Sequence, residues 1–169
     1  MRNEWYILND AMAEKILPAS DLTTALSARR ARKERIVFTN GCFDLLHVGH
    51  TRYLQEARKL GDCLVVGLNS DASVRAIKSD GRPIVPQAQR AEVLAALACV
   101  DHVVIFDEPD PQNLITRIQP DILVKGGDWP IDQIVGREIV QARGGRVVTI
   151  PLVPDVSTTS LIRRIKTLP

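Results

Sequence analysis

Runs of apolar residues alternate along the chain with segments whose apolar residues recur every three or four positions. The runs are short and nearly continuous, which is typical of strands buried on both faces of a sheet. The segments between them have the spacing of amphipathic helices. We predict strands at residues 36–38, 63–68, 102–106, 122–125 and 146–150, and helices near residues 51–60, 87–97, 111–118 and 134–142 and from about residue 157 onward.

Alternation of this kind builds right-handed βαβ units and therefore a parallel sheet with helices on both faces. We predict a three-layer α/β fold with a mostly parallel sheet of about five strands. No internal repeat and no long linker divides this part of the chain, so residues 34–169 are expected to form one domain. Residues 1–33 are expected to be a helical extension, in which Ser20 or Asp21 caps a helix that runs to about Lys33.

Composition and charge exclude several classes of protein. The 169 residues are 45% apolar and 25% charged, which suits a globular domain with a sizeable core. The net charge is only +2, and the basic residues are not massed in one block, so no nucleic-acid partner is expected. No apolar run approaches the roughly 20 residues of a membrane span, and the N-terminus lacks the pattern of a signal peptide. We therefore expect a cytoplasmic protein without membrane association.

Candidate chemistry appears where the first predicted strand meets the next helix, within residues 35–50. Residues 39–41 supply turn residues, and His47 and His50 flank Gly49 at the predicted helix start. In an α/β sheet such a junction binds ligands, because the helix N-terminus presents unpaired N–H groups and partial positive charge.

The paired histidines have three interpretations at this point. They are caps or satisfied polar side chains, or zinc ligands together with Cys42, or ligand-binding groups. The zinc interpretation lacks the spacing of a closed zinc motif and an evident fourth ligand. Two histidines that bracket a glycine at a strand-to-helix turn favour a ligand site. Neither the GxGxxG nor the GxxxxGK pattern occurs, which excludes the common dinucleotide and P-loop sites.

The motif GCFDLLHVGH, which ends in HxGH, resembles the hallmark of the cytidylyltransferase-like nucleotidyltransferases, a Rossmann-like α/β family. The segment STTSLI, more than 100 residues later, looks like the family's Ser/Thr-rich helix start. The intervening NSDASV, GRPIVP, VDHVVIFDE and LVKGGDW are similar to the heptose 1-phosphate nucleotidyltransferases, which form the second half of bifunctional ADP-heptose synthases. The resemblance spans about residues 20–165 and includes no sugar-kinase half, so it implies a free-standing form and a separate kinase.

This resemblance implies transfer of AMP from ATP to D-glycero-D-manno-heptose 1-phosphate, with release of pyrophosphate and formation of ADP-heptose for lipopolysaccharide core. It also implies a homodimer and Mg²⁺ bound mainly through the triphosphate, with no protein metal site. Two alternatives stay open: the same chemistry with GTP, CTP or another sugar or polyol phosphate, and a nucleotide-binding module without turnover. Leu152 stands where glycerol 3-phosphate relatives carry arginine, which argues against that acceptor.

Attack of a sugar phosphate oxygen on the α-phosphorus creates a crowded anionic centre, so catalysis needs positioning and charge stabilisation more than a covalent nucleophile. His47 and His50 are suited to donate hydrogen bonds or positive charge, and Lys78 resembles the family's mobile phosphate-binding lysine. We expect the helix starts at His47 and Ser157 to converge on the same phosphates. The expected nucleotide-binding residues are Thr39, Asn40, Gly41, Phe43, Gly49, Lys125, Gly126, Asp128, Ser157, Thr158 and Thr159.

The expected acceptor-binding residues are Asp44, Asn69, Asp71 and Arg90. Plainer roles remain open for several candidates. Asp44 is also suited to order a turn, and Arg90 to be a solvated residue on an amphipathic helix. Trp129 beside the KGGD segment is either a ligand contact or a packing residue.

Overall fold

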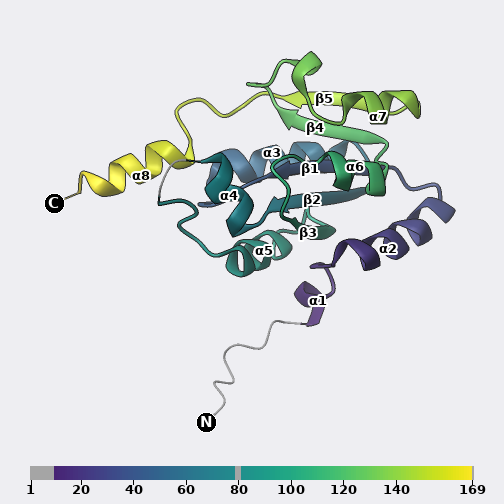
Figure 1. Ribbon diagram of the computed structural model, residues 1–169, viewed down its shortest axis with the longest axis horizontal. Coiled ribbons are helices and arrows are strands. Elements are labelled where there is room, and N and C mark those ends of the chain that lie inside the picture. Colours follow the sequence, from purple (N-terminus) through teal and green to yellow (C-terminus); the bar gives the residue numbers. More distant parts are fainter. Residues whose placement is uncertain (1–9, 79–80, 169) are drawn as a thin grey trace, which may run out of the picture.

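The computed structural model describes residues 10–78 and 81–168. Its centre is a sheet of five parallel strands in the order β3-β2-β1-β4-β5 (Figure 1). This arrangement confirms the predicted α/β class and parallel sheet. The strands are β1 (Ile36–Gly41), β2 (Cys63–Asn69), β3 (His102–Phe106), β4 (Ile122–Gly126) and β5 (Arg146–Ile150).

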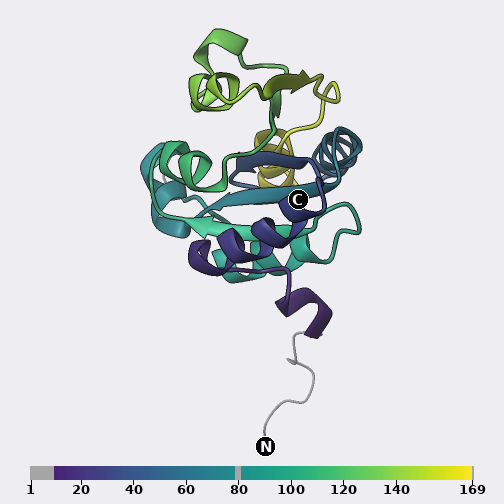
Figure 2. The same ribbon diagram turned by 90° about the vertical axis from the view of Figure 1, so that its right-hand side faces the viewer.

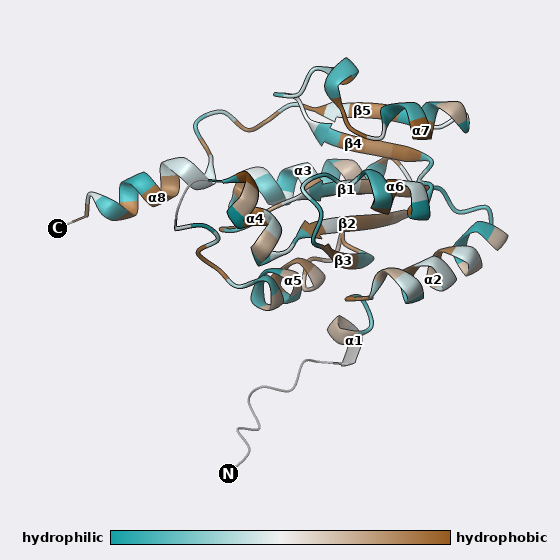
Figure 3. Cartoon of the chain, in the orientation of Figure 1, coloured by the Kyte–Doolittle hydropathy of each residue, from teal (hydrophilic) through white to brown (hydrophobic). Residues whose placement is uncertain are grey.

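Helices cover both faces of this sheet (Figure 2). Successive strand residues point to opposite faces, so Ile36 and Phe38 of β1 join one core and Val37 joins the other. The first core is covered by α2 (Ala19–Ala31), α6 (Gln112–Ile118) and α7 (Arg137–Ala142), and the second by α3 (Val48–Lys59) and α5 (Gln87–Ala95). Figure 3 shows the hydrophobic residues concentrated in the strands, which is why the strand bounds were predictable.

The strand order places a topological switch point beside β1. From β1 the chain moves through β2 and β3 to one edge, and it then returns to build β4 and β5 on the other side. The crossover helices therefore leave a crevice at the carboxyl ends of β1 and β4, where ligands of open α/β sheets bind. Asn40, Gly41, Lys125 and Gly126 occupy these two strand ends.

Three local predictions differ from the structure. The first strand is longer than expected, because Thr39, Asn40 and Gly41 pair with β2 in place of forming a turn. The helix α4 (Asp71–Ile77) was not predicted; the Ser70 hydroxyl caps it by accepting from the Ser73 N–H. The helix expected at residues 134–142 begins only at Arg137 as α7, because Gly136 before it adopts a positive φ of 87°; the 3₁₀ turn η2 (Ile131–Gln133) precedes this segment.

The described part of the N-terminal segment packs on the sheet. After α1 (Asp10–Ala13), the backbone of Lys15 and Leu17 hydrogen bonds with Val103 of the edge strand. The next helix, α2, starts at Ala19 after Pro18 without a side-chain cap, so the predicted capping by Ser20 or Asp21 is wrong. It ends at Ala31, not Lys33. The boundary at residue 33 stays a prediction, although Leu22 of α2 is buried in the same core as β1.

The last helix, α8 (Thr158–Lys166), extends from the body at the end of the molecule where α4 lies (Figure 1). Its start is a capping box, in which the Ser157 hydroxyl accepts from the Ser160 N–H and the Ser160 hydroxyl accepts from the Ser157 N–H. None of its residues is fully buried. Within the described residues, no helix has the length and apolar composition that a membrane crossing requires.

Candidate active site

A two-lobed cleft lies at the carboxyl ends of β1 and β4. Its lobes have volumes of about 450 and 510 Å³, in the range of small-molecule sites. We call them the histidine lobe, which His47, Tyr53, Asp128 and Ser157 line, and the arginine lobe, which Arg82 lines. Both lobes share Asn40, Gly41, Cys42, Phe43, His50, Lys78, Lys125, Trp129, Thr158 and Thr159, so they form one continuous space.

The histidine pair stands at the start of α3. His47 is the N-cap residue with extended backbone, and its carbonyl accepts from the His50 N–H at 2.9 Å. The two imidazole rings stack with centroids 3.8 Å apart, and the Phe43 ring meets His50 edge-on at 5.3 Å. A Cβ atom on Gly49 would lie 2.9 Å from the His47 ring, closer than real Cβ contacts allow. Glycine between the histidines is therefore what permits the stack.

Burial makes both histidines weak bases. It lowers the pKa of His50 to about 4, assisted by the neighbouring His47, and it also lowers the pKa of His47. Both rings are therefore mostly neutral at pH 7, so each carries one N–H donor and neither is a fixed cation. The Nδ1 atoms of both rings are buried and have no hydrogen-bond partner among the described residues.

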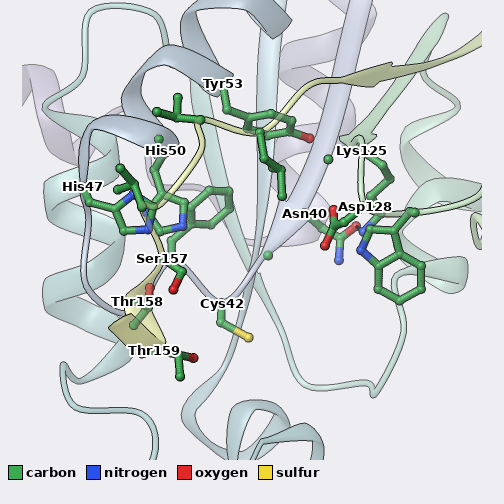
Figure 4. A pocket seen from close by; sticks show the side chains of 18 of the residues that line it. Asn40, Cys42, His47, His50, Tyr53, Lys125, Asp128, Ser157, Thr158 and Thr159 are labelled. Carbon is green, nitrogen blue, oxygen red and sulfur yellow. Dashed lines mark hydrogen bonds between the residues drawn. The ribbon is translucent and has the colours of Figure 1, made fainter. Parts of the chain in front are cut away.

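The opposite wall comes from the end of β4. The Lys125 ammonium donates to Asn40 Oδ1 at 2.5 Å and lies 5.8 Å from the centre of the Trp129 ring. Burial lowers the pKa of Lys125 to about 8, against the attraction of Asp128, so the side chain keeps most of its charge at pH 7. Figure 4 shows Lys125 and Asp128 across the pocket from the two histidines.

Gly126 also has a steric reason to be glycine. A Cβ atom there would lie 2.6 Å from Asp128 Oδ1 and 3.1 Å from the Leu152 side chain. The close approach keeps the Asp128 carboxylate against the backbone at the cleft wall.

Trp129 is 49% exposed and lines both lobes, so it is not the packing residue that the alternative interpretation described.

The second helix start reaches the same cleft. Ser157, Thr158 and Thr159 line the histidine lobe together with His47 and His50 (Figure 4). The Thr158 hydroxyl donates to the Leu45 carbonyl at 3.4 Å and so connects α8 to the loop before α3. The structure thus brings together two helix N-termini that are more than 100 residues apart in sequence. The Ser157 hydroxyl also serves as the N-cap of α8.

Lys78 ends α4 and lines both lobes with an exposed side chain. Like Lys125, it is a cation that borders both lobes, but its side chain is exposed where that of Lys125 is held by Asn40. Asn69 is buried at the end of β2, lines the arginine lobe and donates to Ser73 Oγ at 3.0 Å.

Three predicted ligand residues do not line the cleft. Thr39 is fully buried, and its hydroxyl is 2.7 Å from the Tyr53 hydroxyl. Arg90 is 2% exposed, and its guanidinium is occupied by protein groups. Asp71 accepts from Arg90 at 2.7 Å outside both lobes. These positions correct the prediction, since each side chain is committed to a partner within the protein; the solvated role for Arg90 is wrong as well.

Asp44 lines the arginine lobe, but its carboxylate is engaged. It accepts from the backbone N–H groups of Ile84 at 2.8 Å and Val85 at 2.9 Å and from Arg82 Nε. Burial raises the pKa of Asp44, and these donors outweigh that effect and hold the pKa below its usual value. The turn-ordering role is thus the one that the geometry favours.

Two polar lining residues, Tyr53 and Asp110, were missed by the sequence analysis. Tyr53 follows His50 by three positions on α3, so helical spacing alone places both on one side of that helix. Asp110 follows the third strand within a Pro-Asp-Pro segment, a loop signal that went unused.

Within the described residues, no group of three or more His, Cys, Asp or Glu side chains has the arrangement of a metal site, so the zinc alternative finds no ligand cluster.

The sequence profile of the cytidylyltransferase-like family matches residues 38–164. The chain belongs to the cytidylyltransferase-like family. The match begins in β1 and ends in α8, so it contains both helix starts of the cleft.

Two curated relatives share more than half of their aligned residues with this chain. The bifunctional protein HldE of Syntrophotalea carbinolica is 52% identical over 165 residues, which cover 94% of this chain and 34% of the relative. The bifunctional protein HldE of Nitrobacter hamburgensis is 58% identical over 155 residues, which cover 91% of this chain and 32% of the relative. The chain spans about a third of the length of these relatives.

Solved structures show the same fold. The lipopolysaccharide core biosynthesis protein of Thermoplasma volcanium superposes with a TM-score of 0.58 at 29% identity, over 71% of this chain and 97% of that one. The pantothenate synthetase of Thermus thermophilus superposes with a TM-score of 0.61 over 92% of this chain and 68% of that one. Its identity is only 18%, so it supports the Rossmann-like fold alone.

Proposed function

We propose that this cleft transfers AMP from ATP to D-glycero-D-manno-heptose 1-phosphate, releases pyrophosphate and forms ADP-heptose for lipopolysaccharide core biosynthesis. The observation that carries the proposal is the convergence of the α3 and α8 starts, with His47, His50, Ser157 and Thr158, on one cleft. Two helix N-termini offer N–H groups and partial positive charge to a triphosphate. A continuous second lobe gives the acceptor a place beside it.

The choice of heptose rests on the resemblance of GRPIVP and LVKGGDW to heptose 1-phosphate nucleotidyltransferases. The relatives named bifunctional protein HldE and the lipopolysaccharide core biosynthesis protein support the same pathway. The lean to ATP over GTP and CTP comes from this resemblance too. A cytoplasmic location, a homodimer and a separate sugar kinase that supplies the heptose 1-phosphate belong to the proposal on the same ground.

The proposed reaction is a single displacement. An oxygen of the acceptor phosphate forms a bond to the α-phosphorus of ATP, and the bond from that phosphorus to the bridging oxygen of pyrophosphate breaks. Neutral His47 and His50 donate N–H hydrogen bonds to the phosphoryl oxygens as negative charge accumulates. Lys78 supplies a mobile positive charge, and Lys125 supplies a fixed one from the opposite wall.

Mg²⁺ fits this donor set in a limited way. The histidine lobe, where the triphosphate is proposed to bind, offers the Asp128 carboxylate, and no group of three acidic, His or Cys ligands occurs among the described residues. The cation would therefore be held mainly by phosphate oxygens and water, with Asp128 as the carboxylate that the histidine lobe supplies. Bound in this way, it neutralises the triphosphate and the departing pyrophosphate.

The test is to incubate the protein with Mg²⁺ and ATP, GTP or CTP in turn, with and without heptose 1-phosphate, and to measure the release of pyrophosphate. We expect release that depends on the acceptor and is fastest with ATP. Faster release with CTP or GTP would change the base assignment only. Absence of release with every nucleotide would leave a binding module as the function.

A further inference from the structure

Arg82 is anchored unusually well for an arginine in a loop. Its side chain is 13% exposed and lines the arginine lobe, and its Nε donates to Asp44 Oδ2. The Asp44 side chain is fully buried. The same carboxylate accepts hydrogen bonds from the N–H groups of Ile84 and Val85. A single side chain, that of Asp44 in the loop after β1, therefore holds the turn that follows Arg82.

Arg90 provides a second anchor for this turn. Its guanidinium is fully buried and donates through Nε to the Val85 carbonyl at 2.8 Å. Its Nη1 donates to the carbonyls of Cys42 at 2.6 Å and Asn69 at 2.8 Å, which follow β1 and end β2. Val85 is thus held by its N–H through Asp44 and by its carbonyl through Arg90. The turn is fixed to the strand ends that form the cleft.

This anchoring determines what Arg82 can do. An arginine loses rotamer entropy when one geometry is imposed, and the Asp44 carboxylate offsets that loss before any ligand arrives. Nε is taken by Asp44, and no hydrogen-bond partner of Nη1 or Nη2 occurs among the described residues, so these two groups are available to a ligand in the lobe. A guanidinium that presents planar N–H donors is the side chain best suited to bind a phosphate.

The charges that line the arginine lobe suit an anion. Lys78, Arg82 and Lys125 are cationic, while the carboxylates are Asp110 and the engaged Asp44. Two of the groups expected to hold the triphosphate, His47 and Ser157, line only the histidine lobe of the two, and Arg82 lines only the arginine lobe. Arg82 therefore lies on the side of the shared space away from His47 and Ser157, where a second anion has room beside the nucleotide.

We propose that Arg82 binds the phosphate monoester of the acceptor sugar phosphate, and that Asp44 and Arg90 are positioning residues that hold Arg82 in place. The assignment rests on the proposed function, since it names where the acceptor of that reaction binds. It differs from the sequence prediction, in which Asp44 and Arg90 touch the acceptor themselves. The acceptor phosphate then lies between Arg82 and the shared part of the cleft, where His50 and Lys78 line both lobes.

The test compares Arg82→Gln with Arg75→Gln. Arg75 is an exposed arginine on α4 that lines neither lobe, so its replacement removes the same charge nearby without touching the cleft. For Arg82→Gln we expect the KM for heptose 1-phosphate to rise about tenfold or more, as loss of a charge-assisted hydrogen bond implies, with the KM for ATP within about twofold. Arg75→Gln should keep both values. A rise confined to the KM for ATP, or no rise, would overturn the assignment.

Asp44→Asn tests the positioning role. It keeps an oxygen acceptor but loses the charge that fixes Arg82, so the KM for heptose 1-phosphate should rise and the KM for ATP should not. Equal changes in both constants would mean a general structural defect and would contradict positioning. If Arg82→Gln fails to fold, Arg82→Lys provides the same comparison, because lysine keeps the charge and loses the planar fork; unchanged KM would then overturn the proposal.

Calorimetry separates this inference from the proposed function. Heptose 1-phosphate is titrated into wild type and Arg82→Gln in the presence of a non-hydrolysable ATP analogue. Weaker binding by the variant supports the inference even if wild type shows no turnover, a result that would sink only the proposed reaction. Equal binding by both proteins, or no binding by wild type, would overturn the inference. Turnover by wild type with an unchanged variant would overturn it and leave the proposed reaction standing.

Discussion

His47 and His50 stack their imidazole rings with centroids 3.8 Å apart and an interplanar angle of 25° at the start of α3. Two protonated rings at this separation would repel each other, and burial already disfavours protonation of each. The pair is therefore stable as two neutral rings. In the proposed reaction both rings contribute N–H donors that are in place before charge develops on the phosphoryl group.

Replacement of His50 tests this role. His50→Ala should lower kcat for pyrophosphate release by about 100-fold or more, because one preorganised donor to the transition state is lost. His102→Gln is the matched control, since His102 begins β3 and lines neither lobe. An unchanged kcat for His50→Ala, with the control also unchanged, would return His50 to a structural role.

The steric role of Gly49 predicts a separation of activity from stability. Alanine is favoured over glycine inside a helix by up to about 1 kcal/mol, but a Cβ at this position would displace the His47 ring. Gly49→Ala should therefore lower kcat by about tenfold or more while the protein stays folded. Val48→Ala, which alters an exposed neighbour in the same turn, should keep wild-type activity. Measuring kcat and the circular dichroism spectrum of both variants separates loss of activity from loss of folding. Full activity in Gly49→Ala would contradict the stacked geometry.

The titration of the cleft predicts an unusual pH profile. kcat/KM for ATP reports groups of the free enzyme. It should show no limb near pH 6.5, the ordinary pKa of histidine, because the pKa of His50 is about 4. It should fall as pH rises through about 8, where Lys125 loses its positive charge. A clear limb near pH 6.5 that disappears in His50→Gln would show that the ring is not buried as described.

His50 also links stability to pH. Its pKa is about 4 in the folded protein and about 6.5 in an unfolded chain, so the unfolded state binds the proton more tightly. The stability contributed by neutral His50 is present above pH 6.5 and is lost as pH falls toward 4. Urea unfolding at several pH values should show a steeper loss for wild type than for His50→Gln over this range. Parallel profiles would contradict the lowered pKa.

The buried Arg90 predicts a large stability effect. Arg90→Ala removes the donors to three backbone carbonyls and leaves the Asp71 carboxylate without its partner. Loss of one partner from a buried ion pair typically costs about 3–5 kcal/mol. Urea unfolding should show a loss of this size for Arg90→Ala and less than about 0.5 kcal/mol for the exposed Arg75→Ala. Equal stabilities for the two variants would contradict the network.

The sheet and the two helix starts at the cleft were predictable from sequence because their signals are local. β3 and β5 have the predicted bounds, since each is a short run of mostly apolar residues, and the HxGH and STT motifs each mark a helix start. Helix α4 was missed because a seven-residue helix has little room for periodicity. Its capping serine, Ser70, was the available signal.

The sequence offered a turn-ordering role for Asp44, but the partners of Asp44 and Arg90 were beyond sequence reasoning for a different reason. Most of their partners are backbone groups of Val85, Ile84, Cys42 and Asn69, which have no side-chain signature. A charged residue in an amphipathic helix is also usually solvated. Only the folded arrangement, in which the turn at residues 82–86 approaches the ends of β1 and β2, shows why these charges are buried.

The most direct measurement of the central claim is identification of the product. The protein is incubated with Mg²⁺, heptose 1-phosphate and ATP labelled in its α-phosphate. The nucleotide products are then separated, and their masses are determined by mass spectrometry. We predict that the label appears in ADP-heptose with one equivalent of pyrophosphate, and that His50→Ala forms at most about one-hundredth as much per unit time. Label that remains in ATP, or that appears only in free AMP, would contradict nucleotidyl transfer to the sugar phosphate.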